Sequence, residues 1–180
     1  MPFLSLSILI IPVIAVLLNV LLYRFLLRNT NQKMIFNQII VAILFFAFLF
    51  NAAWEILQIP LYKGGSYEWN HIVFCLLASV ADVIMVLLLY FSFAFIYKNA
   101  LWVKNVNPGK IIVLILTGGI GAILAESRHL LLGTWSYASA MPLIPVVDVG
   151  LSPVLQFMIL PILVYKLSYK IEMNEAKRYE

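Results

Sequence analysis

The sequence predicts an all-α integral membrane protein, a single domain built as a bundle of five transmembrane helices. Of its 180 residues, 64% are hydrophobic and only 11% are charged, which is far from the balance of soluble globular domains. The mean hydropathy of +1.01 agrees with this class. The apolar residues form five runs, each long enough to cross a hydrocarbon core of about 30 Å as a helix.

We expect the helices at roughly residues 4–27, 35–59, 70–97, 110–132 and 151–169. The first run lacks a basic leader and a small-residue cleavage site, which favours a retained helix over a signal peptide. In the fourth, Gly118, Gly119 and Gly121 favour a close helix-packing surface. The fifth begins at Ser152 and Pro153, a good N-cap residue followed by proline at the first helical position.

The basic residues predict the orientation of the bundle. Ten of the twelve lysines and arginines flank one side of it, namely Arg24, Arg28, Lys33, Lys98, Lys104, Lys110, Lys166, Lys170, Lys177 and Arg178. The opposite side carries only Lys63 and Arg128. By the positive-inside rule, the N-terminus is outside, the C-terminus is cytoplasmic, and the protein is a multi-pass protein of a cell membrane, such as the bacterial inner membrane.

Polar side chains fall on one face of each of three helices. The shared face of the second predicted helix carries Asn51, Trp54, Glu55 and Gln58, and that of the third carries His71, Cys75, Ser79 and Asp82. In the fourth predicted helix, Glu126 and His129 share a face with the small residues Gly119, Ala122 and Gly133. With a rise of 1.5 Å per residue, Asp82 lies roughly 16 Å below His71, near mid-bilayer. Glu55 and Glu126 belong to the outer quarter.

Three carboxylates could therefore line one cavity open to the outer side, with Asp82 at its floor. A charge at mid-bilayer costs about 2.5 to 3.5 kcal/mol, so such groups face the bundle interior and have partners. Glu55, Asp82 and Glu126 are the candidate catalytic residues. The structural alternatives are a neutral, hydrogen-bonded Asp82, an interfacial Glu55, and a Glu126 that contacts Arg128 or His129.

The connection between the last two helices, residues 134–152, is mostly apolar and contains Pro142 and Pro145, which prevent a continuous helix. Trp135 and Tyr137 suit a membrane interface. Irregular backbone at membrane depth needs protein or a water-filled cavity to satisfy it. We expect an apolar outer cap loop over the mouth of the cavity, the alternative being a loop that lies among the lipid headgroups.

The sequence favours no metal and no other cofactor. A single cysteine excludes an intrachain disulfide. His71, Cys75 and His129 could each bind a metal, but only Glu126 and His129 have a ligand-like spacing, and it occurs once where di-metal bundles repeat it. Nucleotide-loop and nucleic-acid-binding patterns are absent from the sequence. The expected partners are membrane lipids and a small hydrophobic substrate, and the sequence leaves a homodimer open.

Three stretches resemble an uncharacterised family of small bacterial integral membrane proteins. They are Trp54-Glu55 with Gln58 and Pro60-Leu61-Tyr62, then Asp82-Val83-Ile84, then Trp135-Ser136-Tyr137 through Met141-Pro142 and Gly150-Leu151-Ser152-Pro153 to Gln156. Where family members carry His-Cys-Thr, this chain has Leu77-Ala78-Ser79. The stretch from Asn51 to Glu55 is also faintly similar to the N-x-x-W-E stretch of fungal membrane-bound terpene cyclases. That likeness implies an acid that protonates an epoxide or an olefin.

We therefore predict an intramembrane enzyme that acts on a lipid or isoprenoid by carboxylate acid/base chemistry. A carboxyl group in an apolar pocket can serve as a general acid, and aromatic faces can stabilise a developing cation. The predicted substrate-binding residues are Asn51, Trp54, Gln58, Tyr62, Trp135, Tyr137 and Gln156. The alternatives are a proton- or cation-coupled transporter or channel, and a non-catalytic lipid-binding or assembly protein.

Overall fold

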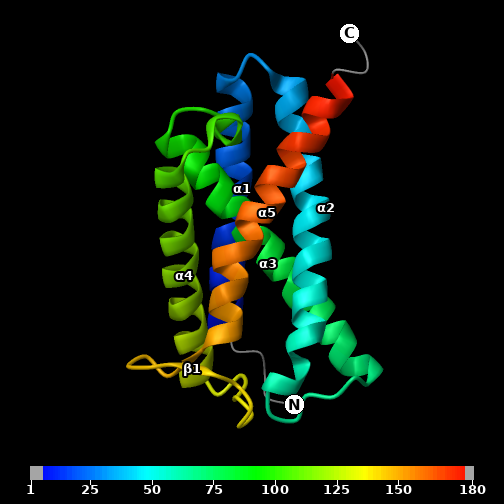
Figure 1. Cartoon of the computed structure of the whole chain (residues 1–180), viewed down its shortest axis with the longest axis vertical. Helices are drawn as coiled ribbons and strands as arrows, with labels where there is room; N and C mark the ends of the chain where they lie inside the picture. Colours follow the sequence, from blue (N-terminus) through cyan, green and yellow to red (C-terminus); the bar gives the residue numbers. More distant parts are fainter. Residues whose placement is uncertain (1–5, 177–180) are drawn as a thin grey trace.

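The computed structural model describes the backbone of residues 6–176 and the side chains of residues 10–171. Its five α-helices are α1 (Leu6–Asn29), α2 (Lys33–Gln58), α3 (Trp69–Ile96), α4 (Pro108–Leu131) and α5 (Leu151–Ala176), shown in Figure 1. The short elements are the 3-10 helices η1 (Ile59–Leu61) and η2 (Trp102–Asn105) and the strands β1 (Leu143–Ile144) and β2 (Val149–Gly150). All five helices are long and apolar enough to cross a membrane, which confirms the predicted all-helical class.

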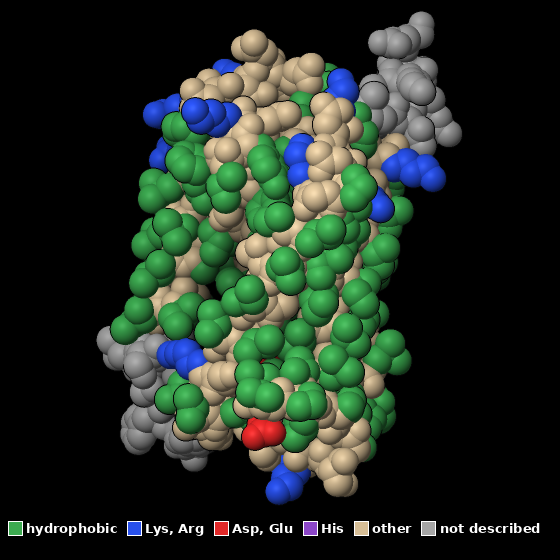
Figure 2. Space-filling model, turned by 60° about the vertical axis from the view of Figure 1, so that its left-hand side comes forward, with side chains coloured by type: hydrophobic (Ala, Val, Ile, Leu, Met, Phe, Trp, Pro, Cys, Tyr) green, Lys and Arg blue, Asp and Glu red, His purple; other side chains and the backbone are tan. Residues whose placement is uncertain are grey.

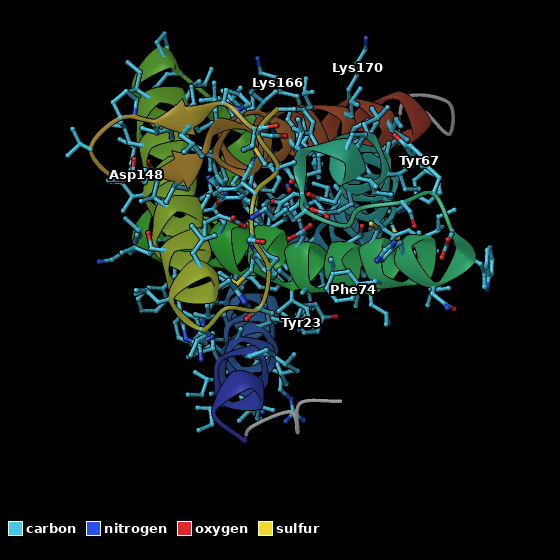
Figure 3. All side chains as sticks on the ribbon, turned by 90° about the horizontal axis from the view of Figure 1, so that it is seen from below. Tyr23, Tyr67, Phe74, Asp148, Lys166 and Lys170 are labelled. Carbon is cyan, nitrogen blue, oxygen red and sulfur yellow. The ribbon has the colours of Figure 1, made fainter. Side chains whose placement is uncertain are left out.

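The helices form an uneven bundle in which α2 packs on both α3 and α5. The first helix packs chiefly on α3, and α4 packs chiefly on α5. Seen from below, α3 runs obliquely across the bundle and passes between α1 and the pair formed by α2 and α5 (Figure 3). The central elements are therefore α2, α3 and α5, with α1 and α4 attached at the flanks.

Four of the predicted helices end within two residues of the observed bounds, but the fifth does not. We predicted that it ends near residue 169, whereas α5 continues to Ala176. The prediction followed hydropathy, which falls where Lys170 begins a charged stretch. A helix can leave the hydrocarbon and continue in water when its residues, such as lysine, glutamate, methionine and alanine, are good helix formers.

An aromatic core fixes the end of the bundle where the C-terminus lies. Tyr90, Trp102 and Tyr165 pack together, with ring centroids 5.4 to 5.9 Å apart. Each polar atom of these rings has a backbone partner, as when the Tyr165 hydroxyl donates to the Val86 carbonyl at 2.7 Å and Trp102 Nε1 donates to the Tyr90 carbonyl at 3.2 Å. Such bonds remove the cost of burying polar atoms and join α3, η2 and α5.

Helix α1 is attached to α3 by a buried amide that the sequence reasoning did not single out. Asn19 Nδ2 donates to the carbonyls of Ala15, at 2.9 Å, and of Ile84, at 3.0 Å. Because both partners can only accept, the orientation of the amide is fixed. Its Oδ1 atom is buried without a hydrogen-bond partner among the described residues, which makes Asn19 a cost to α1 as well as an anchor.

Glycine brings α4 into backbone contact with α5. A Cβ atom built on Gly118 would lie 2.1 Å from the carbonyl oxygen of Phe157, so the two helices approach too closely for any side chain there. Gly119 faces Met158 on the same side, whereas Gly121 has nothing within 4 Å. The predicted packing surface is therefore confirmed for Gly118 and Gly119 and wrong for Gly121, because the helical period turns Gly121 away from α5.

The two ends of the bundle differ in charge. Figure 1 places the N-terminal end of α1 and the C-terminal end of α5 at opposite ends of the molecule. In Figure 2 lysine and arginine side chains gather at the end where α5 finishes, and few lie at the other end. We call the first the basic end. Residues 134–150, which we call the lid, run across the other end, and we call that end the lid end.

The glycine contact yields a stability prediction. Gly118→Ala should lower the melting temperature in detergent, at a cost on the order of 1–3 kcal/mol, because the added methyl group must force α4 from α5. Gly121→Ala is the matched control and should be neutral or raise stability by up to about 1 kcal/mol, since alanine is the better helix former. Equal melting temperatures for the two variants would contradict the contact.

The charge asymmetry yields a topology prediction. Reporter fusions at residues 30 and 104 and at the C-terminus should report a cytoplasmic location, and a fusion at residue 66 should report the outer side. A cytoplasmic residue 66 would contradict the predicted orientation, because the acidic side of the bundle would then face inward.

Candidate functional site

The lid is joined to the end of α2 by main-chain hydrogen bonds. Tyr62 and Tyr137 form an antiparallel bridge, in which the Lys63 amide donates to the Ser136 carbonyl at 2.8 Å and the Ala138 amide to the Leu61 carbonyl at 2.9 Å. This bridge satisfies backbone groups that could not remain unpaired next to hydrocarbon. The lid is therefore held by hydrogen bonds to the segment that follows α2.

The second half of the lid is a hairpin that closes onto the start of α5. Leu143 pairs with Gly150 and Ile144 with Val149, and Figure 3 shows Asp148 pointing outward from this hairpin. Gly150 allows Tyr137 and Met141 to pack against the backbone, since a Cβ atom there would lie 2.9 Å from Met141 Sδ and 3.0 Å from Tyr137 Cζ. The glycine thus sets how deeply Tyr137 enters the lid end.

Beneath the lid, Gln156 joins three helices. Its Nε2 atom donates to Asn51 Oδ1 of α2 at 2.9 Å and to Asp82 Oδ2 of α3 at 3.0 Å. Gln156 and Asn51 are each 1% exposed. Asn51 Nδ2 donates to the Ala47 carbonyl at 2.7 Å, so Asn51 Oδ1 is the atom that meets Gln156, as an acceptor. This contact fixes the orientation of the Gln156 amide, whose N–H₂ group also faces Asp82.

The network continues from Gln156 toward the lid. Gln58 Nε2 donates to Glu55 Oε1 at 2.8 Å and lies 3.4 Å from Gln156 Oε1. The Ser152 hydroxyl donates to Gln58 Oε1 at 2.9 Å and accepts from Trp54 Nε1 at 3.2 Å. Indole nitrogen can only donate, so the direction of every bond is fixed from Trp54 to Asp82.

The two carboxylates of this network are held in the same way. One oxygen of each, Glu55 Oε1 and Asp82 Oδ2, accepts an N–H of a glutamine side chain. The other oxygen of Asp82 takes part in no hydrogen bond within the described residues, and Gln156 also lies close enough to bond to the Glu55 carboxylate. Neither second oxygen is fully enclosed and unpaired. An acid whose first oxygen is positioned and whose second is available has the geometry of a proton donor or acceptor.

Glu126 belongs to a separate group at the lid. Its Oε2 atom accepts from Trp135 Nε1 at 3.2 Å and from the Tyr137 hydroxyl. His129 stacks on Trp135 with ring centroids 4.1 Å apart. The hydrogen bonds of Glu126 are thus with the lid, and the predicted pairing with Arg128 or His129 stays a prediction.

Tyr62 lies between the two groups. Its ring packs on Trp135 and Tyr137, with centroids 6.2 and 5.6 Å away. Burial raises the pKa of its hydroxyl, and the nearby carboxyl groups of Glu126, Glu55 and Asp82 raise it further. The ring of Tyr62 thus belongs to the aromatic group that contacts Glu126.

The structure places the residues predicted for the site in two hydrogen-bonded or packed groups. Asn51, Gln58 and Gln156 bond to one another or to the carboxylates, so their visible role is to orient those acids. The prediction that Ser152 is the N-cap of the last helix was wrong. Ser152 lies one residue inside α5, and its hydroxyl donates a hydrogen bond to Gln58. Nothing in the local sequence distinguishes these two uses of a serine before proline.

The metal-capable residues lie apart. Among the described residues, no three His, Cys, Asp or Glu side chains are close enough to hold a metal ion. His71 contacts Ser66, Cys75 is buried in α3, and His129 stacks on Trp135. Two hollows of the described structure lie toward the basic end, and neither is lined by a carboxylate. The predicted outer cavity therefore stays a prediction.

Comparison with known proteins adds no assignment. No protein-family model matches the chain, and neither the curated proteins nor the solved structures contain a significant match.

The lid tyrosines yield a prediction of pH dependence. Burial raises the pKa of Tyr137, and its hydrogen bond to Glu126 raises it further. The folded protein therefore keeps protons that the unfolded chain loses above about pH 10, so the free energy of unfolding should fall as pH rises beyond that value. Tyr137→Phe should flatten this decline in melting temperature, and adding Tyr62→Phe should flatten it more. If the melting temperature falls equally steeply with pH in all three proteins, these tyrosines are not the groups responsible.

Proposed function

We propose that the protein is an intramembrane enzyme that acts on a lipid or isoprenoid by carboxylate acid/base chemistry beneath the lid. One observation carries the proposal: Glu55 and Asp82 each present one oxygen held by a glutamine N–H and a second oxygen available for proton transfer. Ordinary structural carboxylates in a membrane are satisfied by a partner at every oxygen that they bury.

The pair can supply both halves of a proton-transfer reaction. One carboxyl group protonates a double bond or an epoxide of the substrate, and the other carboxylate removes a proton from the resulting cation. The product is an isomer or a ring-closed form of the substrate with the same atoms. Exchange with water restores the two protonation states before the next turnover, so the reaction consumes no co-reactant.

The surroundings suit a cationic intermediate. Trp54 is tied to the network through Ser152, and Tyr62, Trp135 and Tyr137 form an aromatic group beside it. Aromatic faces stabilise a cation and exclude water, which would otherwise add to it. Glu126 holds two of these rings in place, so its proposed role is to position the aromatic lid rather than to transfer the proton itself.

A substrate dissolved in the bilayer would approach from the side. Figure 2, which turns the α4 side forward, shows a hollow at about mid-height on that face. This is the depth at which the hydrocarbon part of a lipid lies. The opening supports a substrate drawn from the membrane over one delivered from water.

A proton or cation relay is supported less well. Between Asp82 and the basic end the packed core consists of apolar and aromatic side chains such as Ile39, Ile43, Val86 and Tyr90. The polar atoms of its aromatic residues are bonded to backbone carbonyls. A relay requires a continuous row of groups that can bind and release a proton or cation across the whole bundle. An active site that opens to one side only does not require such a row.

The test compares lipid extracts of cells with and without the protein by chromatography and mass spectrometry. The expected change is a new lipid species that has the same mass as its substrate but a different retention time. Glu55→Gln and Asp82→Asn should each reduce its formation by at least about a hundredfold, the usual contribution of a general acid or base.

Two exposed acids at the lid end provide matched controls. Glu68→Gln and Asp148→Asn make the same chemical changes outside the network and should leave product formation unaltered; asparagine also tolerates the positive φ of 51° at Asp148. Folding is checked by the melting temperature of each purified variant. If the Glu55 and Asp82 variants fold but the extract still changes, the acid/base assignment is wrong; if neither variant folds, the carboxylates serve to hold the helices together.

A further inference from the structure

At the basic end, away from the proposed catalytic residues, α2 and the end of α5 border an open, shallow groove. It has a volume of about 570 Å³ and is lined by Asn37, Gln38, Val41, Ala42, Phe45, Phe46 and Ile171. Six of these seven residues form two rows on α2, each advancing one helical turn at a time. The volume lies within the range of small-molecule sites in proteins.

The groove changes in polarity along its length. Its mouth carries the amides Asn37 and Gln38, and one to two turns further into the bilayer it is lined by Val41, Phe45 and Phe46. Asn37 Oδ1 accepts from the Tyr23 hydroxyl at 3.0 Å, which turns the Asn37 N–H₂ group away from α1. The mouth therefore presents hydrogen-bond donors, and the interior presents hydrocarbon.

Among the side chains that the structure describes, the charge beside the mouth is basic. Lys33 lies one turn before Asn37 on the same face of α2 and is exposed. Lys166 and Lys170 extend outward from α5 in Figure 3. The acidic side chains that the structure describes, Glu55, Glu68, Asp82, Glu126 and Asp148, are all at the lid end or at mid-height. An anionic group with oxygen acceptors complements this mouth.

We propose that the groove binds one anionic phospholipid of the leaflet at the basic end. The phosphate meets the N–H groups of Asn37 and Gln38 and the charge of Lys33, and one acyl chain lies along Val41 and Phe45. Amide donors, a cation and an apolar channel follow one another in the same order as phosphate, glycerol and acyl chain along a lipid. The occupant is thus a lipid rather than a soluble anion or a second copy of the protein.

The experiment is native mass spectrometry of the full chain, purified in detergent and supplied with phosphatidylglycerol or with phosphatidylcholine of the same acyl chains. One phosphatidylglycerol should remain bound under conditions that remove phosphatidylcholine. Lys33→Gln should weaken this binding about fivefold, the usual contribution of one basic residue near an anionic lipid. Gln38→Leu should weaken it as well, and Lys104→Gln, which removes a charge at the same end but outside the groove, should not.

Four outcomes would overturn the proposal. Equal retention of the two lipids would remove the headgroup preference, and undiminished binding in Lys33→Gln would place the lipid elsewhere. A short-chain phosphatidylglycerol that binds as well as the long-chain form would show that the apolar groove is not occupied. A dimer that excludes the lipid would assign the groove to a second copy. Glu55→Gln should bind the lipid normally, so the result is independent of the proposed catalysis.

Discussion

The hydrogen bonds of Gln156 are the interaction on which the arrangement of α2, α3 and α5 depends. Its amide meets Asn51, Asp82 and Gln58 at a depth where water cannot replace a missing partner. A buried polar group left unpaired costs about 1–3 kcal/mol, so displacement of any one helix would leave several such groups unsatisfied together. The polar network therefore fixes the relative positions of the helices more strictly than apolar packing against lipid would.

This network also explains why the bundle is divided into two halves. At the basic end, Tyr90, Trp102 and Tyr165 are packed and their polar atoms are committed to backbone carbonyls. That half is stabilised by close packing, and the polar atoms of these three rings are occupied by the backbone. At the lid end, acids and amides replace hydrophobic residues, which costs stability but supplies groups that can exchange protons. Active sites commonly give up local stability in this way.

The lid covers one end of the bundle without a membrane-spanning element. Its main-chain bridge to Tyr62 and Lys63 positions it from α2, and the bonds from Trp135 and Tyr137 to Glu126 position it from α4. Gly150 gives Tyr137 the space to enter. Because both α4 and the segment that follows α2 hold the lid, opening it would require breaking polar contacts with both.

The sequence by itself determined the five helices, the polar faces and the residues of the candidate site, because hydropathy and the helical period are local properties. It identified Glu55, Asp82, Gln58 and Gln156 as candidates, since polar side chains within an apolar run are conspicuous. Only the tertiary structure decided that Ser152 bonds to Gln58 rather than capping α5, that Glu126 belongs to the lid, and that Asn19 attaches α1. Each of these depends on a partner from a distant helix, and which helices become neighbours is set by packing, such as the contact at Gly118, that no local pattern contains.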